Sequence, residues 1–192
     1  QNRNLQISYF IQSRVDLLLK EDTINALAAS GLEEVWVGAE SASQKILDAM
    51  DKGTQVSEIY EATHLLKQKN IKVAFFLQFG YLTETQEDIQ KTIQMVKELL
   101  PDNIGISVSY PLPGTKFYDK VKDDLQLKAN WKDSDDLDLM FHGTYSSNYY
   151  RKLQRFVHKE YRKSQGFYYL KHLFNTQISS NKNSLFFILV FV

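Results

Sequence analysis

Residues 33–53 read EEVWVGAESASQKILDAMDKG, and this stretch holds one complete step from a strand to a helix. Its apolar core at 35–37 is typical of a buried strand, and a helical pattern runs from Ser43 to Met50. Between the two stands a carboxylate, Glu40, followed by hydroxyl side chains. A helix cap needs only one such polar side chain. The acid at the strand end therefore needs another explanation.

The same alternation of strand and helix covers the first two thirds of the chain. The run 71–79 is almost continuously apolar, which is typical of a strand buried on both faces in a parallel sheet. Thr85 and Asp88 form a capping-box pattern at the start of a helix. Strands are predicted at 7–11, 35–37, 71–79 and 104–110, and helices at 21–30, 43–50, 56–69, 85–100 and 116–122. This order predicts an α/β fold with parallel strands, either a doubly wound sheet or a (β/α) barrel.

Polar residues follow each predicted strand. In both candidate folds, ligands bind at the carboxyl ends of the strands. Glu40 is therefore expected at the ligand-binding edge of the sheet. The strand-end residues are Gln12, Ser13 and Arg14, then Glu40 and Ser41, then Gln78 and Gly80, and finally Tyr110 and Pro111.

Composition excludes several kinds of site. Lys plus Arg equals Asp plus Glu at 23 each, so the net charge gives no reason to expect nucleic acid or an anionic membrane as partner. The sequence has no cysteine, which excludes disulfides and a cysteine-ligated metal or cluster in this chain. Its four histidines lack zinc-ligand spacing, and no glycine-rich phosphate loop is present. We expect no metal ligands in this chain and a cytoplasmic protein.

The last third has a different character. A loop at 131–138 is acidic, and 149–163 is predicted to be a basic, aromatic, amphipathic helix. The favoured interpretation is a helix that packs on the preceding fold with its basic face in solvent. A basic aromatic surface for RNA is the alternative, against which the neutral net charge and the lack of a recognisable stacking motif weigh.

The two ends of the chain carry further predictions. The first residue is Gln1 and no signal-peptide pattern follows, so we expect a chain clipped at its front. The apolar run 185–192 is far shorter than the ~20 residues of a membrane span. The favoured interpretation is a buried or artefactual end, and a membrane helix cut short is the alternative, which leaves membrane association open.

Three strand-end motifs follow one another in a fixed order: GAESASQKILDAMDKG, VAFFLQFGYLTETQEDIQKT and ISVSYPLPGTKFY. Together they resemble the later half of the radical S-adenosylmethionine (radical SAM) enzymes, particularly those with an N-terminal cobalamin-binding domain. That family shows G-x-E-S-G-S…L…K-G, then G-x-P-G-E-T, then P-x-P-G-T before an aromatic residue. The matching residues are Gly38, Glu40, Ser41, Ser43, Lys52 and Gly53, then Gly80, Glu84 and Thr85, then Pro111, Pro113, Gly114, Thr115 and Tyr118.

The resemblance covers residues 7–118 and implies a partial (β/α) barrel. The four βα units would be the last four of the family's six, and the C-x-x-x-C-x-x-C motif that binds the [4Fe-4S] cluster would lie upstream. The implied organisation is the C-terminal part of the barrel at 1–125, a loop and helical extension at 126–178, and a polar linker with an apolar tail at 179–192. Cobalamin would bind an upstream domain, if it is used.

The resemblance also implies roles for the strand-end residues in binding S-adenosylmethionine (SAM). Glu40 and Ser41 would contact its ribose or its amino-acid part, and Ser13 and Arg14 its carboxylate. An ion pair of Arg14 with Asp16 or another acid is the alternative for that arginine, and Gln78 is alternatively a satisfied strand-end amide. Gln78 and Gly80 would line the adenine side, with Tyr110 and Pro111 closing it.

This sequence departs from the family pattern at two turns. Ala42 stands where the family has glycine after Glu-Ser, and its Cβ narrows the backbone conformations of that turn. Leu82 and Thr83 stand in place of Pro-Gly, so the turn after the third strand must be built differently or be looser.

The implied parent is an enzyme that cleaves SAM reductively at a [4Fe-4S] cluster and uses the 5′-deoxyadenosyl radical on an organic substrate of unknown identity. We expect the 192-residue chain alone to be inactive, and its catalytic residues are unknown. A non-catalytic scaffold or binding protein derived from a decayed barrel is the alternative. An aldolase-like lyase is disfavoured, because no strand ends on a lysine that would form a Schiff base.

Overall fold

A computed structural model describes residues 7–125 and 137–173. The predictions for the first part of the acidic loop, for the polar linker and for the apolar tail fall at 126–136 and 174–192, outside the described residues.

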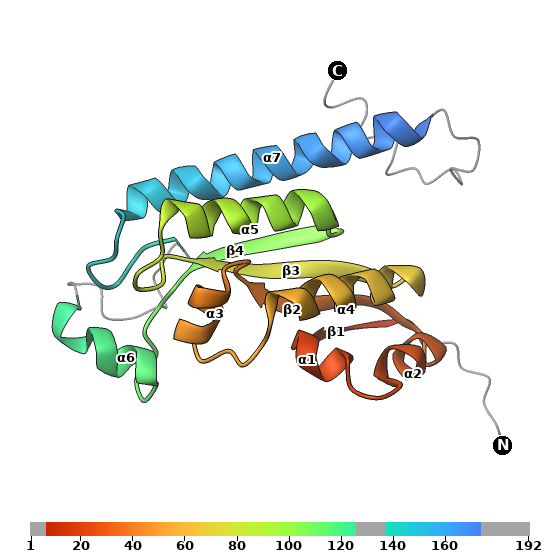
Figure 1. Ribbon diagram of the computed structural model, residues 1–192, viewed down its shortest axis with the longest axis horizontal. Coiled ribbons are helices and arrows are strands. Elements are labelled where there is room, and N and C mark those ends of the chain that lie inside the picture. The colour runs from red at the N-terminus through yellow and green to blue at the C-terminus, as the bar shows by residue number, and fades with distance from the viewer. Residues whose placement is uncertain (1–6, 126–136, 174–192) are drawn as a thin grey trace.

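The described fold is built on a four-stranded parallel sheet (Figure 1). Its strands are β1 (Tyr9–Ser13), β2 (Leu32–Glu40), β3 (Lys72–Phe79) and β4 (Asn103–Val108). They lie in the order β1-β2-β3-β4, whereas a doubly wound sheet reverses its strand order at a switch point. The fold class is therefore α/β of the partial barrel type, as the sequence predicts.

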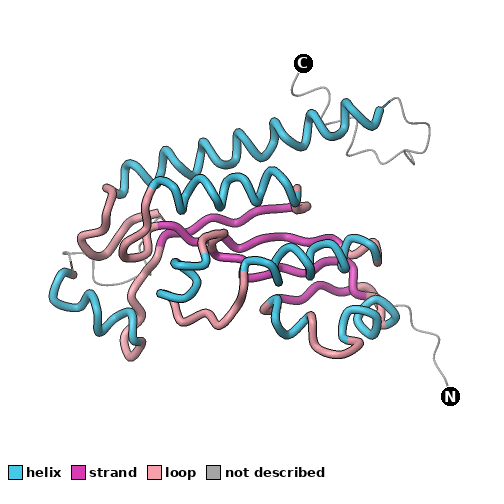
Figure 2. Tube along the Cα trace, viewed as in Figure 1, coloured by secondary structure: helices cyan, strands magenta, loops and turns pink. Residues whose placement is uncertain are grey.

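The predicted helices form (cyan in Figure 2), and their boundaries are shifted by a few residues. Two differences are larger. The four-residue α1 was not predicted, because a single turn shows no periodicity, and α7 continues ten residues beyond its predicted end at 163. The helices are α1 (Val15–Leu18), α2 (Thr23–Ala29), α3 (Gln44–Ala49), α4 (Val56–Gln68), α5 (Gln86–Leu99), α6 (Lys116–Val121) and α7 (Ser147–Leu173), with a short 3-10 turn, η1 (Lys122–Asp124).

The two faces of the sheet differ in burial. Residues on the helix-covered face, such as Val37 and Phe75, are fully buried. On the opposite face, Trp36 and Phe76 are only half-buried and their rings pack 4.7 Å apart. The prediction that β3 is buried on both faces is therefore wrong, because the helices pack against one face and leave the other partly open.

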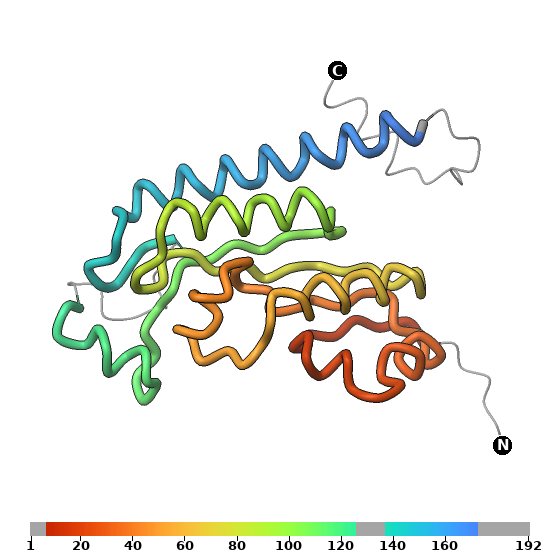
Figure 3. The backbone as a smooth tube through the Cα atoms, in the orientation of Figure 1, coloured from red at the N-terminus to blue at the C-terminus, as the bar shows by residue number. Residues whose placement is uncertain are grey.

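Helix α7 lies along α5 and contacts β4 (Figures 1 and 3). Leu153, Val157 and Tyr161 are buried on one side of it, and the Tyr161 hydroxyl donates a hydrogen bond to the Pro101 carbonyl at 2.7 Å. The favoured interpretation of a helix packed on the preceding fold is confirmed. No helix in the described ranges is long and apolar enough to cross a membrane.

The turn between β3 and α5 shows how the departure from Pro-Gly is accommodated. Thr83 has a φ of 66°, in the left-handed region that glycine favours. Its carbonyl accepts a hydrogen bond from Lys45 Nζ at 2.9 Å. Ala42, by contrast, has a negative φ, so the turn after β2 tolerates its Cβ.

Replacing Thr83 with glycine is expected to stabilise the protein. A left-handed conformation costs an L-residue roughly 1–2 kcal/mol, and the extra backbone entropy of glycine offsets about 0.5–1 kcal/mol of that gain. Urea unfolding of Thr83→Gly should show a net gain of about 0.5–1 kcal/mol. Thr83→Ala keeps the Cβ and serves as the control, and a gain of the same size in both variants would contradict the explanation.

Candidate functional site

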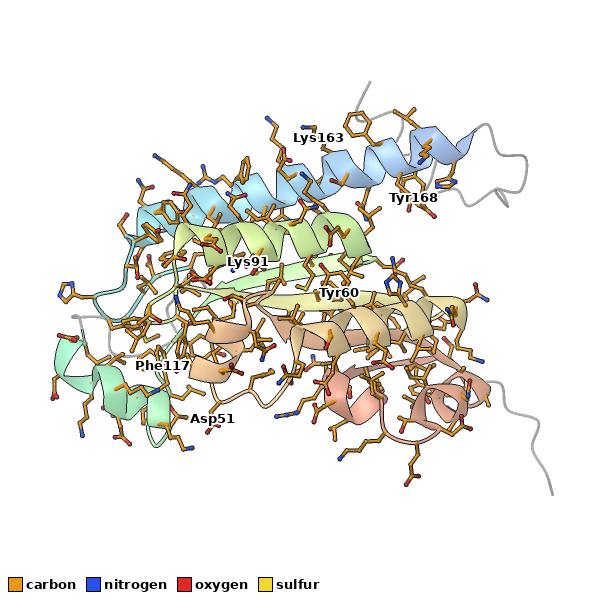
Figure 4. All side chains as sticks on the ribbon, viewed as in Figure 1. Asp51, Tyr60, Lys91, Phe117, Lys163 and Tyr168 are labelled. Carbon is orange, nitrogen blue, oxygen red and sulfur yellow. The ribbon has the colours of Figure 1, made fainter. Side chains whose placement is uncertain are left out.

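A cavity of about 400 Å³ opens at the carboxyl ends of the strands. Three predicted site residues, Glu40, Gln78 and Tyr110, come together in it from β2, β3 and the loop after β4. Asp51 and Phe117, labelled in Figure 4, belong to the α3 and α6 sides of the same cavity. The remaining lining residues are Ala49, Met50, Lys52, Tyr81, Leu112, Thr115, Lys116 and Lys120.

A second hollow, of about 720 Å³, lies at the opposite ends of the strands, beside Lys72 and Asn103. Ligands of parallel α/β folds bind at the carboxyl ends of the strands. The smaller cavity is therefore the candidate site, in spite of its size.

The backbone of Glu40 is strained. Its φ is 56°, and the pairing of β2 with β3 shifts register between Gly38 and Glu40. A register shift of this kind re-aims the side chains at a strand end, and left-handed backbone at a residue other than glycine is concentrated at functional sites. Glu40, which the sequence pattern singled out, is thus one of six described non-glycine residues with a positive φ, and β2 shifts register at the same place.

Glu40 forms an ion pair with Lys52 inside the cavity. Glu40 Oε1 and Lys52 Nζ are 2.7 Å apart, and the two side chains are 16% and 22% exposed. The pair lies against Gly38, where a Cβ would come within 2.9 Å of both charged atoms. A side chain at position 38 would therefore displace the pair, which presents a carboxylate and an ammonium together.

Arg14 supports this pair through the backbone of Lys52. Its guanidinium donates to the Lys52 carbonyl at 2.8 Å and is paired with Asp16, with 2.9 Å between Nε and Oδ1. The ion pair that the sequence allowed as an alternative is thus present. Ser13 donates to the Arg14 carbonyl at 3.1 Å. Neither residue lines the cavity, and their proposed contact with the SAM carboxylate stays a prediction.

The serines after Glu40 hydrogen-bond the turn that follows β2 to α5. Ser41 is 1% exposed, with its hydroxyl 3.2 Å from that of Thr92, and Ser43 donates to Asp88 Oδ1 at 2.6 Å. Burial raises the pKa of Asp88, but hydrogen bonds from Ser43 and Thr85 outweigh it and hold that pKa well below its usual range. The Ser41 hydroxyl therefore has a partner on α5. Its contact with a cofactor stays a prediction.

Gly80 and Pro111 also lie beside the cavity rather than on its wall. Gly80 has a φ of 80° and donates its N–H to Glu84 Oε2 at 2.7 Å. A Cβ on it would lie 3.2 Å from the ring of Tyr150 on α7. Pro111 is buried between Tyr110 and Leu112, which both line the cavity.

Two features of the site were missed from the sequence. Lys52 was noted only as a motif match, although its place in the same motif as Glu40 was a usable signal. Lys116 on α6 pairs with Asp51 at 2.5 Å, and Phe117 stacks on Tyr81 with 4.7 Å between ring centroids. These contacts join α6 to the cavity, and no local pattern reveals them.

The described part of the chain offers no group of three or more His, Cys, Asp or Glu side chains that would hold a metal ion.

Comparison with known proteins gives partial matches. No protein-family model matches the sequence. An uncharacterized methyltransferase of Pyrococcus horikoshii is 29% identical over 133 residues, which are 69% of this chain and 29% of that protein. The anaerobic magnesium-protoporphyrin IX monomethyl ester cyclase of Cereibacter sphaeroides is 28% identical over 123 residues, 64% of this chain and 20% of the cyclase. The chain thus spans less than a third of the length of either relative.

Two solved structures share the fold. The Elp3 protein of the archaeon Methanocaldococcus infernus has a TM-score of 0.54 and 27% identity, over 59% of this chain and 27% of Elp3. Coproporphyrinogen III oxidase of Escherichia coli, a radical SAM enzyme, has a TM-score of 0.50 and 17% identity, over 55% of this chain and 24% of the oxidase. The comparisons confirm the fold class and the resemblance that the strand-end motifs indicate.

The buried Glu84 carboxyl should make stability depend on pH. Glu84 is 1% exposed, and burial raises its pKa to about 7, whereas an exposed Glu titrates near ~4.3. The folded state then binds more protons than the unfolded state between these values, so stability falls as pH rises through this window. The loss reaches up to about 3.7 kcal/mol, at 1.36 kcal/mol per pKa unit.

Glu84→Gln should flatten this pH dependence, because the amide oxygen still accepts from Gly80 without carrying a charge. Urea unfolding from about pH 5 to about pH 8 measures it. Glu87→Gln, an exposed position in α5, is the control and should keep the wild-type slope. An unchanged slope in Glu84→Gln would assign the pH dependence to another group.

Proposed function

We propose that this chain, which is similar to part of the barrel of the radical SAM enzymes, contributes the SAM-binding pocket of such an enzyme. The observation that carries the proposal is the Glu40–Lys52 ion pair in the cavity at the carboxyl ends of the strands. A decayed scaffold has no need to keep a strained acid and a mostly buried ion pair at that edge.

The pair fits the amino-acid part of SAM. The Glu40 carboxylate suits the ammonium of that part, and the Lys52 ammonium suits its carboxylate. Lys52 has three N–H donors, of which one goes to Glu40, so donors remain for a ligand. The Arg14 contact to the Lys52 carbonyl fixes the loop that carries this ammonium.

The other side of the cavity suits the nucleoside. Gln78 is half-buried at the end of β3, and its amide offers both a donor and an acceptor to a base edge. Tyr110, 43% exposed, offers a ring face beside it. Gly80 and Pro111 set the backbone that positions these two side chains.

The remaining cofactors would depend on residues outside this sequence. The chain has no cysteine, so its residues do not fit a [4Fe-4S] cluster, and cobalamin would likewise bind elsewhere in the parent. In that parent, SAM would supply a 5′-deoxyadenosyl radical for hydrogen abstraction from an organic substrate. The residues of this chain would bind SAM, orient it and limit the access of water to it.

Binding of SAM to the isolated chain tests the role of Glu40. Isothermal titration calorimetry should show that Glu40→Gln weakens binding by about 10-fold or more, since a hydrogen bond to a charged group contributes ~1.5–3 kcal/mol. Glu33→Gln, an exposed position on the same strand, is the control and should bind as the wild type does. Equal affinity of the two variants for SAM would show that Glu40 does not contact it.

Cluster reconstitution tests the predicted inactivity of this chain alone. Incubation with iron and sulfide under anaerobic conditions should leave no [4Fe-4S] absorbance after desalting, because no thiolate ligand is available. A stable cluster spectrum with one cluster bound per chain would contradict the prediction.

A further inference from the structure

Positive charge is concentrated on α7. The whole chain has equal numbers of basic and acidic residues, but the 27 residues of α7 include seven Lys or Arg and one Glu. The neutral total therefore hides a strong separation of charge within the fold.

Most of this charge is not neutralised locally. The one acid of α7, Glu160, is already contacted by Lys163 at 3.6 Å and by Lys97 of α5 at 3.7 Å. Within the described ranges, Arg155, Lys159 and Arg162 have no ion-pair partner, and all three are exposed.

These three cations lie on one side of the helix. Their spacing of four and three residues places them on adjacent turns, and we name them the cationic stripe. Together with Gln154 and His158, they line a hollow of about 420 Å³. Both of these neighbours are half-buried and polar, so every residue that lines the hollow is polar or positively charged.

An aromatic ring borders the stripe. Phe156 is 47% exposed and lies one turn from Lys159 on the same helix. The side of α7 that packs on α5 is occupied by buried residues, among them Leu153 and Val157. Figure 4 shows Lys163 on the outer side of α7, so the helix presents charge to solvent there.

We propose that the cationic stripe and Phe156 bind a single-stranded segment of nucleic acid. Guanidinium groups pair with phosphate oxygens in a bidentate manner, and exposed aromatic rings stack on unpaired bases. The segment's phosphates occupy the hollow and a base stacks on Phe156. Nothing in the stripe reads base identity, so binding is independent of sequence.

An anionic membrane fits these observations less well. A helix that lies in a membrane interface buries a continuous apolar face, and the continuous apolar face of α7 packs on α5. The exposed large apolar residues of α7 fall into two separate places, Phe156 and a group of Phe167, Tyr168 and Leu170. Phe156 and Phe167 are about 16 Å apart along the helix, and lysines lie between them. The hollow lined by arginine, lysine, glutamine and histidine suits a phosphodiester better than a lipid surface.

The proposal does not depend on the SAM pocket. The cationic stripe is on α7, and none of its residues lines the cavity at the strand ends. Binding of nucleic acid and binding of SAM can therefore be lost separately, by different substitutions.

Fluorescence anisotropy with labelled single-stranded RNA and DNA of about 20 nucleotides tests the proposal. The triple variant R155E/K159E/R162E should bind about 10-fold or more weakly, and its slope of log affinity against log salt should be shallower by about 2, at ~0.7 per lost phosphate contact. The control is K20E/K69E/K72E, three exposed lysines with the same change of net charge. It should keep wild-type affinity within about twofold.

Phe156→Ala should weaken binding about fivefold without changing the salt slope, because stacking releases no counterions. Circular dichroism confirms that each variant is folded, and R155Q/K159Q/R162Q replaces the charge reversal if that variant unfolds. The glutamine variant should likewise bind the oligonucleotides more weakly than the control variant does.

Three outcomes would overturn the proposal. The first is an equal loss in the stripe and control variants, which would indicate general charge attraction. The second is binding to vesicles of phosphatidylcholine with about one third phosphatidylserine but not to either oligonucleotide. The third is no oligonucleotide binding by the wild-type chain at low salt.

Discussion

The buried carboxylate of Asp88 joins the two turns on which the candidate site depends. Its Oδ1 accepts from Ser43 in the turn after β2, and its Oδ2 accepts from the Thr85 N–H at 2.9 Å in the turn after β3. Several donors to one carboxylate compensate for its removal from water. Because Glu40 immediately precedes the first turn and Gly80 begins the second, this one group fixes the relative position of the strand ends.

Local patterns in the sequence predicted the elements of the fold, and tertiary contacts decided the details of the site. The Thr85–Asp88 capping box and the apolar strand of 71–79 are short-range signals, and both are present in the structure. The left-handed backbone of Glu40 coincides with a register shift in the pairing of β2 with β3, which sequence periodicity does not encode. The contact of Ser41 with α5 is also long-range. Its hydroxyl partner, Thr92, is 51 residues away, so no local pattern predicts it.

The net charge of the whole chain is a poor guide to the charge of a single helix. A sum over 192 residues is zero, and from that sum no polyanionic partner is expected. The local sequence of 149–163 is nevertheless basic, and α7 holds a single acid, Glu160, which is already paired. An average over the sequence therefore describes the solubility of the chain better than it describes any one surface.

The half-buried face of the sheet also carries an aromatic pair between the two ends of the strands. Trp36 and Phe76 lie side by side across β2 and β3, and the absence of a side chain at Gly105 lets them extend toward β4, since a Cβ there would be 3.3 Å from the indole. Phe76 precedes Gln78 by two residues, or about 7 Å of strand. The two rings line neither hollow and lie between the candidate cavity at one end of the strands and the larger hollow at the other end.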